Sequence, residues 1–262
     1  MDYDLPKELL VTADGPVRIV TLNRPDDLNA ANEPLHAALA SVWGRLAADR
    51  EARVAILTGA GRAFSAGGDF QWMTQIQSDL AYRERIIDEA RRILGEMLRF
   101  PLPLIAAVNG PAVGLGCSLA LCCDLVLISE KAHLADPHVA VGLAAGDGGA
   151  ALWPFMTSLL RAKEYVFTGD RIGADLAVQL GLANRVVAHG EVMAEATKLA
   201  QRLASLPQRA LADTKRAMNA HLAQAMAGPM EIALTAELQS MGSEEHKDRV
   251  RELLAGRAGA RK

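Results

Sequence analysis

Two glycine-rich turns, each placed directly after a short apolar run, constrain this chain more than any other feature. Residues 54–58 run into the turn 59–69, and residues 104–108 run into the turn 109–116. Glycine tolerates positive φ and allows close approach of a ligand, and the first N–H groups of a following helix lack intrahelical partners. If the two runs are neighbouring strands of one parallel sheet, two backbone N–H groups can converge on one oxygen. The pattern therefore predicts an oxyanion hole.

Strand-like and helix-like segments alternate along the chain up to about residue 190. Residues 9–13 and 17–22 predict a hairpin, and 125–129 and 184–187 predict further strands. Helices are expected after an N-cap at Asn32, over the apolar positions 86–98, and over 117–123 and 150–159. From residue 191 onward only helical segments follow. We therefore predict an α/β fold with a core of residues 1–190 and a C-terminal helical region of residues 191–262.

Composition narrows the functional classes. The 262-residue chain carries a net charge of −3 and has no basic block, which argues against a nucleic-acid partner. No apolar run reaches the roughly 20 residues that span a bilayer, and the N-terminus does not resemble a signal peptide. The three cysteines lack the spacing of a disulfide framework or a zinc site. We expect a cytoplasmic protein with no membrane partner and no bound metal.

Two other interpretations of the glycine turns stay open at this point. Gly114 and Gly116 could begin a dinucleotide-binding fingerprint, but Leu119 stands where that motif needs its third glycine. The glycines could also serve only to make tight turns.

The turns resemble those of the crotonase superfamily, the enoyl-CoA hydratase/isomerase family. Residues 63–69 look like its first signature and residues 109–121, ending at Cys123 and Asp124, look like its second. Further segments that fit in the same order are 23–25, 167–172, 181–186 and 214–215. The resemblance therefore covers nearly the whole chain.

This resemblance implies a spiral of β-β-α units and a C-terminal helical region that builds homotrimers, often paired into hexamers. It implies an acyl-CoA thioester substrate, with coenzyme A as part of the substrate and no separate cofactor. By motif position, the backbone N–H groups of Gly68 and Leu115 would hold the thioester oxygen. Ala66 would lie near the adenine and Arg24 near the coenzyme A phosphates. Trp72 is expected either to line the acyl pocket or to pack in the core.

The chain departs from the family at both positions where hydratases carry a glutamate. Ser118 and His138 occupy these positions, and a serine hydroxyl is a poor general base at neutral pH. Histidine titrates near neutrality, and a carboxylate can orient it, so His138 and Asp147 become the candidate acid–base residues. Ser118 is expected to contact the substrate.

Alternatives remain for the residues and for the function. His138 could be a loop residue bonded to backbone, Asp147 could cap the following helix, and Asp69 is predicted to be a helix cap. The reaction stays open among double-bond isomerisation, hydration and hydrolysis. Two rival functions are a C–C hydrolase of a β-diketone on the same fold and a non-catalytic coenzyme A-binding protein.

Overall fold

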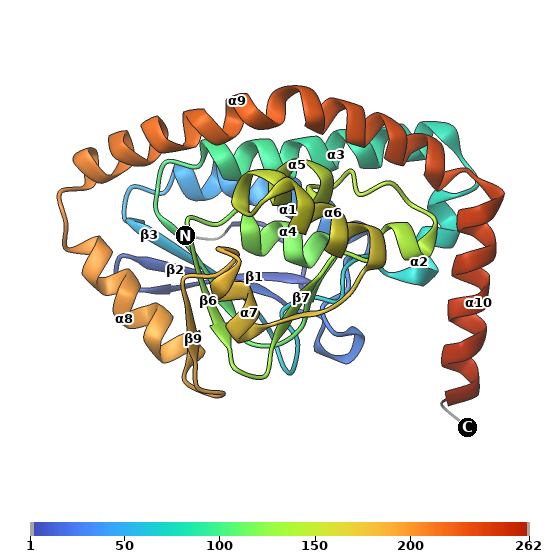
Figure 1. Cartoon of the computed structure of the whole chain (residues 1–262). Helices are drawn as coiled ribbons and strands as arrows, with labels where there is room; N and C mark the ends of the chain where they lie inside the picture. Colours follow the sequence, from blue (N-terminus) through green and yellow to red (C-terminus); the bar gives the residue numbers. More distant parts are fainter. Residues whose placement is uncertain (1–2, 261–262) are drawn as a thin grey trace.

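The computed structural model describes residues 3–260 and is organised around a six-stranded sheet (Figure 1). Its strand order is β1-β2-β3-β4-β6-β9, and only the β1–β2 hairpin is antiparallel. The predicted hairpin and the parallel pairing of β3 with β4 are thus confirmed. The strands are β1 Leu9–Asp14, β2 Val17–Leu22, β3 Val54–Gly59, β4 Leu104–Val108, β6 Leu125–Ser129 and β9 Arg185–Val187.

A second, three-stranded sheet lies beside the first. It consists of β5 Ala112–Val113, β7 His133–Ala135 and β8 Ile172–Gly173. The sequence pattern did not predict these strands, because segments of two or three residues are too short to show a period. The second sheet matters for the site, because β7 leads directly to Asp136 and His138.

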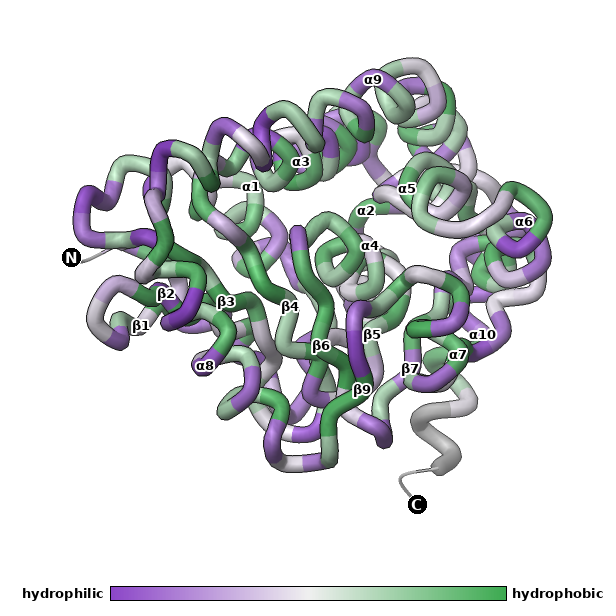
Figure 2. Tube along the Cα trace, turned by 60° about the vertical axis from the view of Figure 1, so that its left-hand side comes forward, coloured by the Kyte–Doolittle hydropathy of each residue, from purple (hydrophilic) through white to green (hydrophobic). Residues whose placement is uncertain are grey.

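Helices cover both faces of the main sheet. On one face lie α1 Glu33–Ala47, α3 Leu80–Arg99 and the long α9 Gln208–Met241, and on the other lies α8 Val192–Ala204 (Figure 1). The buried strands are apolar along their length, as Figure 2 shows for β3, β4 and β6. Alternate side chains of β3 therefore enter separate cores: Leu57 packs in the larger core with α1, α3 and α9, and Ile56 packs against α8.

The remaining helices surround the second sheet and the chain ends. They are α2 Phe70–Ile76, α4 Leu115–Leu121, α5 Gly149–Met156, α6 Leu159–Thr168, α7 Ala174–Gln179 and α10 Glu244–Ala260, with 3₁₀ turns η1 Pro25–Asp27 and η2 Val139–Val141. None of the helices in residues 3–260 is long and apolar enough to cross a membrane.

Some predicted helix limits need correction. The helix predicted over 117–123 begins two residues earlier, at Leu115, because Gly114 turns the chain with a φ of 54°. The helix predicted over 150–159 ends at Met156, and Ser158 then caps α6 by accepting a hydrogen bond from the Arg161 N–H. Asn32 caps α1 as predicted.

The two glycine turns lie side by side and are bonded to each other. The Ser65 N–H donates to the Pro111 carbonyl at 3.0 Å, and the Val113 N–H donates back to the Ser65 carbonyl at 2.9 Å. The contact is closest at Gly110, where an added Cβ would lie 2.1 Å from the Arg62 carbonyl oxygen. A side chain at position 110 would therefore separate the turns.

We predict that Gly110→Ala lowers the free energy of unfolding by about 3 kcal/mol, because the colliding atoms belong to backbone that cannot rotate away. Urea denaturation would measure this. Gly173→Ala is the matched control, since an added Cβ there meets nothing within 4 Å. A loss below about 1 kcal/mol for Gly110→Ala would contradict the prediction.

Candidate active site

One small pocket brings together most of the residues that the sequence singled out. The pocket has a volume of about 60 Å³, and Gly68, Trp72, Leu115, His138 and Asp147 all line it. Further apolar side chains complete its walls: Ile86, Ile87 and Ala90 of α3, Leu143 of the loop after η2, and Met241 of α9. Residues far apart in the sequence are therefore neighbours here.

The Gly68 amide faces away from the strand-like segment beside it. The Ala31 N–H donates to the Gly67 carbonyl at 2.7 Å, and the Asp69 N–H donates to the Ala31 carbonyl at 2.9 Å. In a parallel pairing of this kind, the residue between the two bonded positions directs its own N–H to the other side. Within residues 3–260 the Gly68 N–H has no backbone acceptor.

The Leu115 amide is free for a different reason. Leu115 is the first residue of α4, where an N–H has no intrahelical acceptor, and the preceding Gly114 N–H already donates to the Ala135 carbonyl at 2.9 Å. The two turns touch beside these amides, since an added Cβ at Gly67 would lie 2.9 Å from the Val113 carbonyl oxygen. The assignment of Gly68 and Leu115 to an oxyanion hole remains a prediction.

His138 lies between two carboxylates. Its Nδ1 is 2.5 Å from Asp136 Oδ1, and its Nε2 is 3.3 Å from Asp147 Oδ2. Burial disfavours the charged ring, but Asp147 and Asp136 outweigh burial and raise the pKa of His138 well above its usual range. At neutral pH both ring nitrogens therefore carry a proton. The ring bonds to carboxylates, so the alternative of a ring bonded to backbone is wrong.

Asp147 is held by side chains and does not cap α5. Its carboxylate accepts a hydrogen bond from Ser118 Oγ at 3.2 Å in addition to its contact with His138. Gly148 is the N-cap residue of α5, and no side chain caps that helix. The capping alternative for Asp147 is therefore wrong. Ser118 is fully buried behind Asp147 and does not line the pocket, so it contacts the acidic side chain rather than the pocket interior.

Sequence reasoning missed Asp136, whose side chain is fully buried. The Asp136 carboxylate fits here because residue 149 is a glycine. An added Cβ at Gly149 would lie 1.8 Å from Asp136 Oδ2. Because Asp136 bonds Nδ1 of His138, it fixes the orientation of the ring.

Sequence reasoning also missed Glu237, which α9 contributes to the pocket. The residue is 4% exposed, and its Oε2 atom has no hydrogen-bond partner in the described part of the chain. Burial and the charge of Asp147 raise the pKa of Glu237 to about 8. A sequence signal existed: Glu237 falls on the apolar face of α9, three residues after Leu234 and four before Met241.

These side chains also form a donor set of the kind that holds a cation. One ligand atom each from His138, Asp147 and Glu237 lies within 4.8 Å of the others. A metal at this position would have to displace the proton that His138 Nε2 holds toward Asp147.

The remaining predicted residues lie outside the pocket. The Arg24 guanidinium is 2.6 Å from Asp27 and 2.9 Å from Asp69, so two carboxylates already neutralise it. Asp69 also caps α2 through the Gln71 N–H, as predicted. Ala66 is half-buried in the first turn, where its N–H donates to the Leu28 carbonyl.

Two histidines without a predicted role also line the pocket. His36 Nδ1 is 2.8 Å from Glu89 Oε2, and its ring lies 5.3 Å from that of Trp72. His246 donates from Nδ1 to the Val141 carbonyl at 2.7 Å. Trp72 in turn donates from Nε1 to the Tyr82 hydroxyl, which fixes the indole in the pocket wall.

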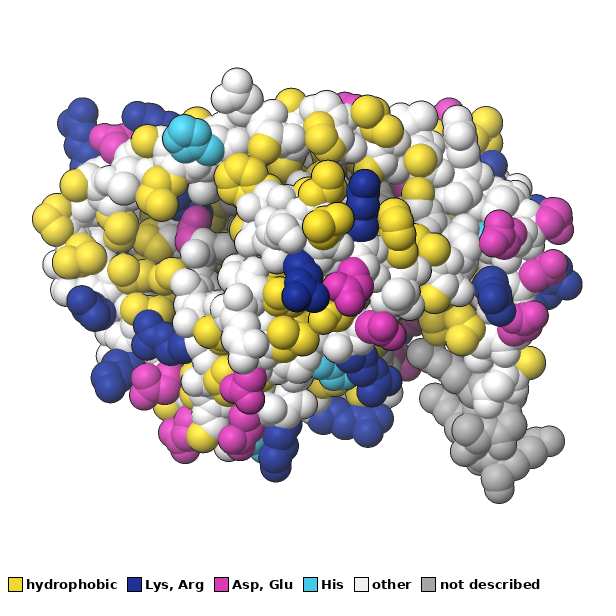
Figure 3. All heavy atoms as spheres, viewed as in Figure 1, with side chains coloured by type: hydrophobic (Ala, Val, Ile, Leu, Met, Phe, Trp, Pro, Cys, Tyr) yellow, Lys and Arg dark blue, Asp and Glu magenta, His cyan; other side chains and the backbone are white. Residues whose placement is uncertain are grey.

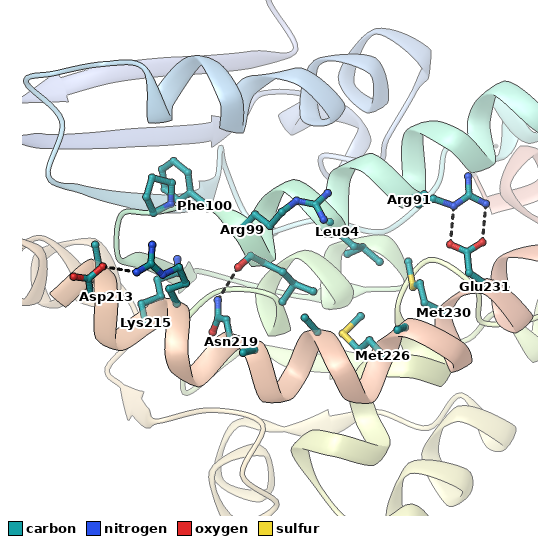
Figure 4. A pocket seen from close by; sticks show the side chains of 18 residues that line it. Arg91, Leu94, Arg99, Phe100, Asp213, Lys215, Asn219, Met226, Met230 and Glu231 are labelled. Carbon is teal, nitrogen blue, oxygen red and sulfur yellow. Dashed lines mark hydrogen bonds and ion pairs between the residues drawn. The ribbon is translucent and has the colours of Figure 1, made fainter. Parts of the chain in front are cut away.

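A larger cavity, of about 750 Å³, is a separate groove between α3 and α9 (Figure 4). Phe100, Met226 and Met230 are among its apolar lining residues, and the paired side chains of Arg91 and Glu231 bridge the two helices at one end. None of the sequence-predicted site residues lines this groove. The chemistry-bearing groups are concentrated in the small pocket instead.

Comparison with known proteins decides the family. The model of the enoyl-CoA hydratase/isomerase family matches residues 12–257. This chain belongs to the enoyl-CoA hydratase/isomerase family. The predicted crotonase-like α/β fold is thereby confirmed. An enoyl-CoA hydratase/isomerase crystal structure from Mycobacterium paratuberculosis is 51% identical to this family member, with a TM-score of 0.93 over 95% of this chain and all of that one.

Curated relatives agree with this assignment. The short-chain-enoyl-CoA hydratase of Clostridium acetobutylicum is 32% identical over 92% of both chains. The 2,3-dehydroadipyl-CoA hydratase of Escherichia coli is 34% identical over 88% of this chain and 86% of its own length. The new family member is accordingly an enzyme of the enoyl-CoA hydratase/isomerase type.

Proposed function

We propose that this enzyme acts on an acyl-CoA thioester and stabilises its enolate with the backbone N–H groups of Gly68 and Leu115. The observation that carries the proposal is the position of these two amides. The residues Gly68 and Leu115 both line the pocket that holds His138 and Asp147, and neither backbone N–H has a backbone acceptor within residues 3–260. Donors aimed at a developing oxyanion supply a large share of the rate in acyl chemistry, since they need no reorganisation during reaction.

Acid–base chemistry falls to His138, which stands in place of one of the family's glutamates, and to Asp147. His138 is held as an imidazolium between two aspartates, so it can donate a proton, and the Asp147 carboxylate can accept one. Coenzyme A enters as part of the substrate, and the reaction needs no metal. The relatives named above as hydratases of enoyl-CoA substrates support this substrate class.

The proposal is tested by incubating the protein with crotonyl-CoA, a dienoyl-CoA and a 3-oxoacyl-CoA in the presence of a chelator. Mass spectrometry separates the outcomes, because hydration adds one water, isomerisation leaves the mass unchanged, and hydrolysis cleaves the chain. Binding of these thioesters without turnover would favour a non-catalytic coenzyme A-binding protein and contradict the proposal.

A second candidate, hydrolysis of a C–C bond in a β-diketone without coenzyme A, is favoured by one observation. Arg24, the cation expected near the coenzyme A phosphates, is already paired with Asp27 and Asp69. A ligand of the native state must raise its melting temperature. Failure of millimolar coenzyme A to raise Tm would therefore point to the diketone hydrolase.

We further propose that the protein assembles as a homotrimer or as a hexamer of two trimers. Large apolar side chains of α5 and α6 face solvent in the single chain, with Leu160 80% and Phe167 64% exposed (Figure 3). Exposed apolar groups gathered on one surface are typical of protein interfaces. Sedimentation equilibrium should give three or six times the chain mass of 27.9 kDa, and a monomer would contradict this.

A further inference from the structure

We propose that Glu237, rather than His138, gives the proton to the substrate in this site and that Asp147 is its partner as proton acceptor. Together they would supply the two carboxyl groups that are missing at positions 118 and 138. The inference rests on the proposed acyl-CoA chemistry. It concerns a residue of the C-terminal helical region, which the sequence connected only with assembly.

The first argument is position. Glu237 extends from α9 into the pocket, where it lies with His138 and Asp147 such that their reactive atoms are within 4.8 Å of one another. The Glu237 side chain lies directly against Gly146, where an added Cβ would lie 2.4 Å from Glu237 Oε2. Only a residue without a side chain at position 146 leaves room for this carboxyl group beside Asp147.

The second argument is the unequal environment of the two carboxyl groups. Asp147 accepts a hydrogen bond from the Ser118 hydroxyl at 3.2 Å and lies 3.3 Å from His138 Nε2. Glu237 has the Asp147 backbone N–H nearby, but its Oε2 atom has no hydrogen-bond partner within residues 3–260. Neighbouring titratable groups in such different surroundings are how enzymes separate an acid from a base.

The charges around Glu237 agree with this division. Burial first, and then the negative charges of Asp147 and Asp136, raise the pKa of Glu237 to about 8, while the charge of His138 opposes them. His36 and His246 face the same pocket from α1 and α10. At neutral pH Glu237 thus carries the proton that a general acid needs.

Hydration of an enoyl-CoA shows how the pair would work. Asp147 takes a proton from water, the oxygen of that water bonds to the β-carbon, and the electrons of the double bond move onto the thioester oxygen. The enolate then collapses as Glu237 gives its proton to the α-carbon. Passage of the proton from Asp147 to Glu237 restores both groups, and the sum is one water added. In isomerisation the same pair would move one proton between two carbons.

Glu237→Gln keeps the size of the side chain and removes its acidity. On whichever acyl-CoA the wild type converts, we expect kcat to fall roughly 100-fold, with Kd for the thioester within about threefold of wild type. The wild-type rate should fall as pH rises through about 8, where the acid loses its proton, and the residual rate of the variant should lack this limb. Glu231→Gln is the matched control, because Glu231 lies on the same helix in an exposed pair with Arg91.

A carbon-13 titration of wild-type protein gives an independent readout that does not need the variant to be active or folded. One glutamate carboxyl carbon is expected to titrate near pH 8, and its signal should persist in Glu231→Gln, since the acid concerned is Glu237. A carboxyl that is ionised at pH 7, or a folded Glu237→Gln enzyme with at least half the wild-type kcat and the same alkaline limb, would overturn the role of Glu237. A wild type that converts no thioester of the panel would instead overturn the proposed function.

Discussion

Replacing Asp147 by asparagine is expected to lower kcat by roughly 10³-fold or more, with little change in the affinity for the acyl-CoA. The amide keeps the shape of the side chain and can still accept the Ser118 hydrogen bond, but it cannot take up a proton. It also removes one of the two charges that hold His138 as an imidazolium. Steady-state kinetics with a thioester-binding measurement would separate kcat from Kd.

Two companion variants make this test specific. His138→Ala removes the ring that joins the two aspartates and should lower kcat by a similar factor. Asp213→Asn changes an exposed aspartate of α9, paired with Arg216, and should leave the rate near wild type. If His138→Ala and Asp147→Asn both kept full turnover on the true substrate, the acid–base assignment would be wrong.

Leu115→Pro is expected to lower kcat by roughly 10²–10³-fold, the usual effect of removing one donor of an oxyanion hole. Proline lacks an N–H, and the first position of a helix is the one where it fits best. Leu115 occupies that position in α4 and its N–H bonds to no backbone acceptor in residues 3–260, so the fold loses no hydrogen bond. The change therefore removes the proposed donor and little else.

Leu115→Ala is the control for the lost side chain, because it shortens the residue to Cβ and keeps the N–H. We expect its kcat to stay within about tenfold of wild type. Equal rates for the proline and alanine variants, measured on protein with a native circular dichroism spectrum, would show that the Leu115 amide takes no part in the reaction.

The main sheet could be predicted from sequence because its signals are local. The buried strands β3 and β4 are unbroken apolar runs, and the glycine turn after each is visible in the same short window. Helix starts depend on longer-range contacts and were predicted less well. Gly148, and not Asp147, is the N-cap residue of α5, because the Asp147 carboxylate contacts Ser118 and His138 rather than the nearest backbone amide.

The residues of the candidate site likewise fall into two groups, those with a local sequence signal and those without one. His138 and Asp147 could be found because they stand nine residues apart, at and near a position where the family pattern changes. Asp136 and Glu237 could not be found in this way, since their roles depend on burial that only the folded chain creates. Glu237 lies ninety positions after Asp147, and nothing local distinguishes it from the solvated acids of α9 except its place on the apolar face.

The helix α9 joins two ends of the molecule that are far apart. Near its start, Lys215 bonds the Leu102 carbonyl at 2.8 Å and Asp124 at 2.7 Å, which anchors it beside the first residues of β4 and β6. Near its end it carries Glu237. A chimera that took residues 191–262 from a relative would thus exchange a reactive carboxyl group along with the helices. Recombination between relatives at that junction would be expected to alter chemistry as well as assembly.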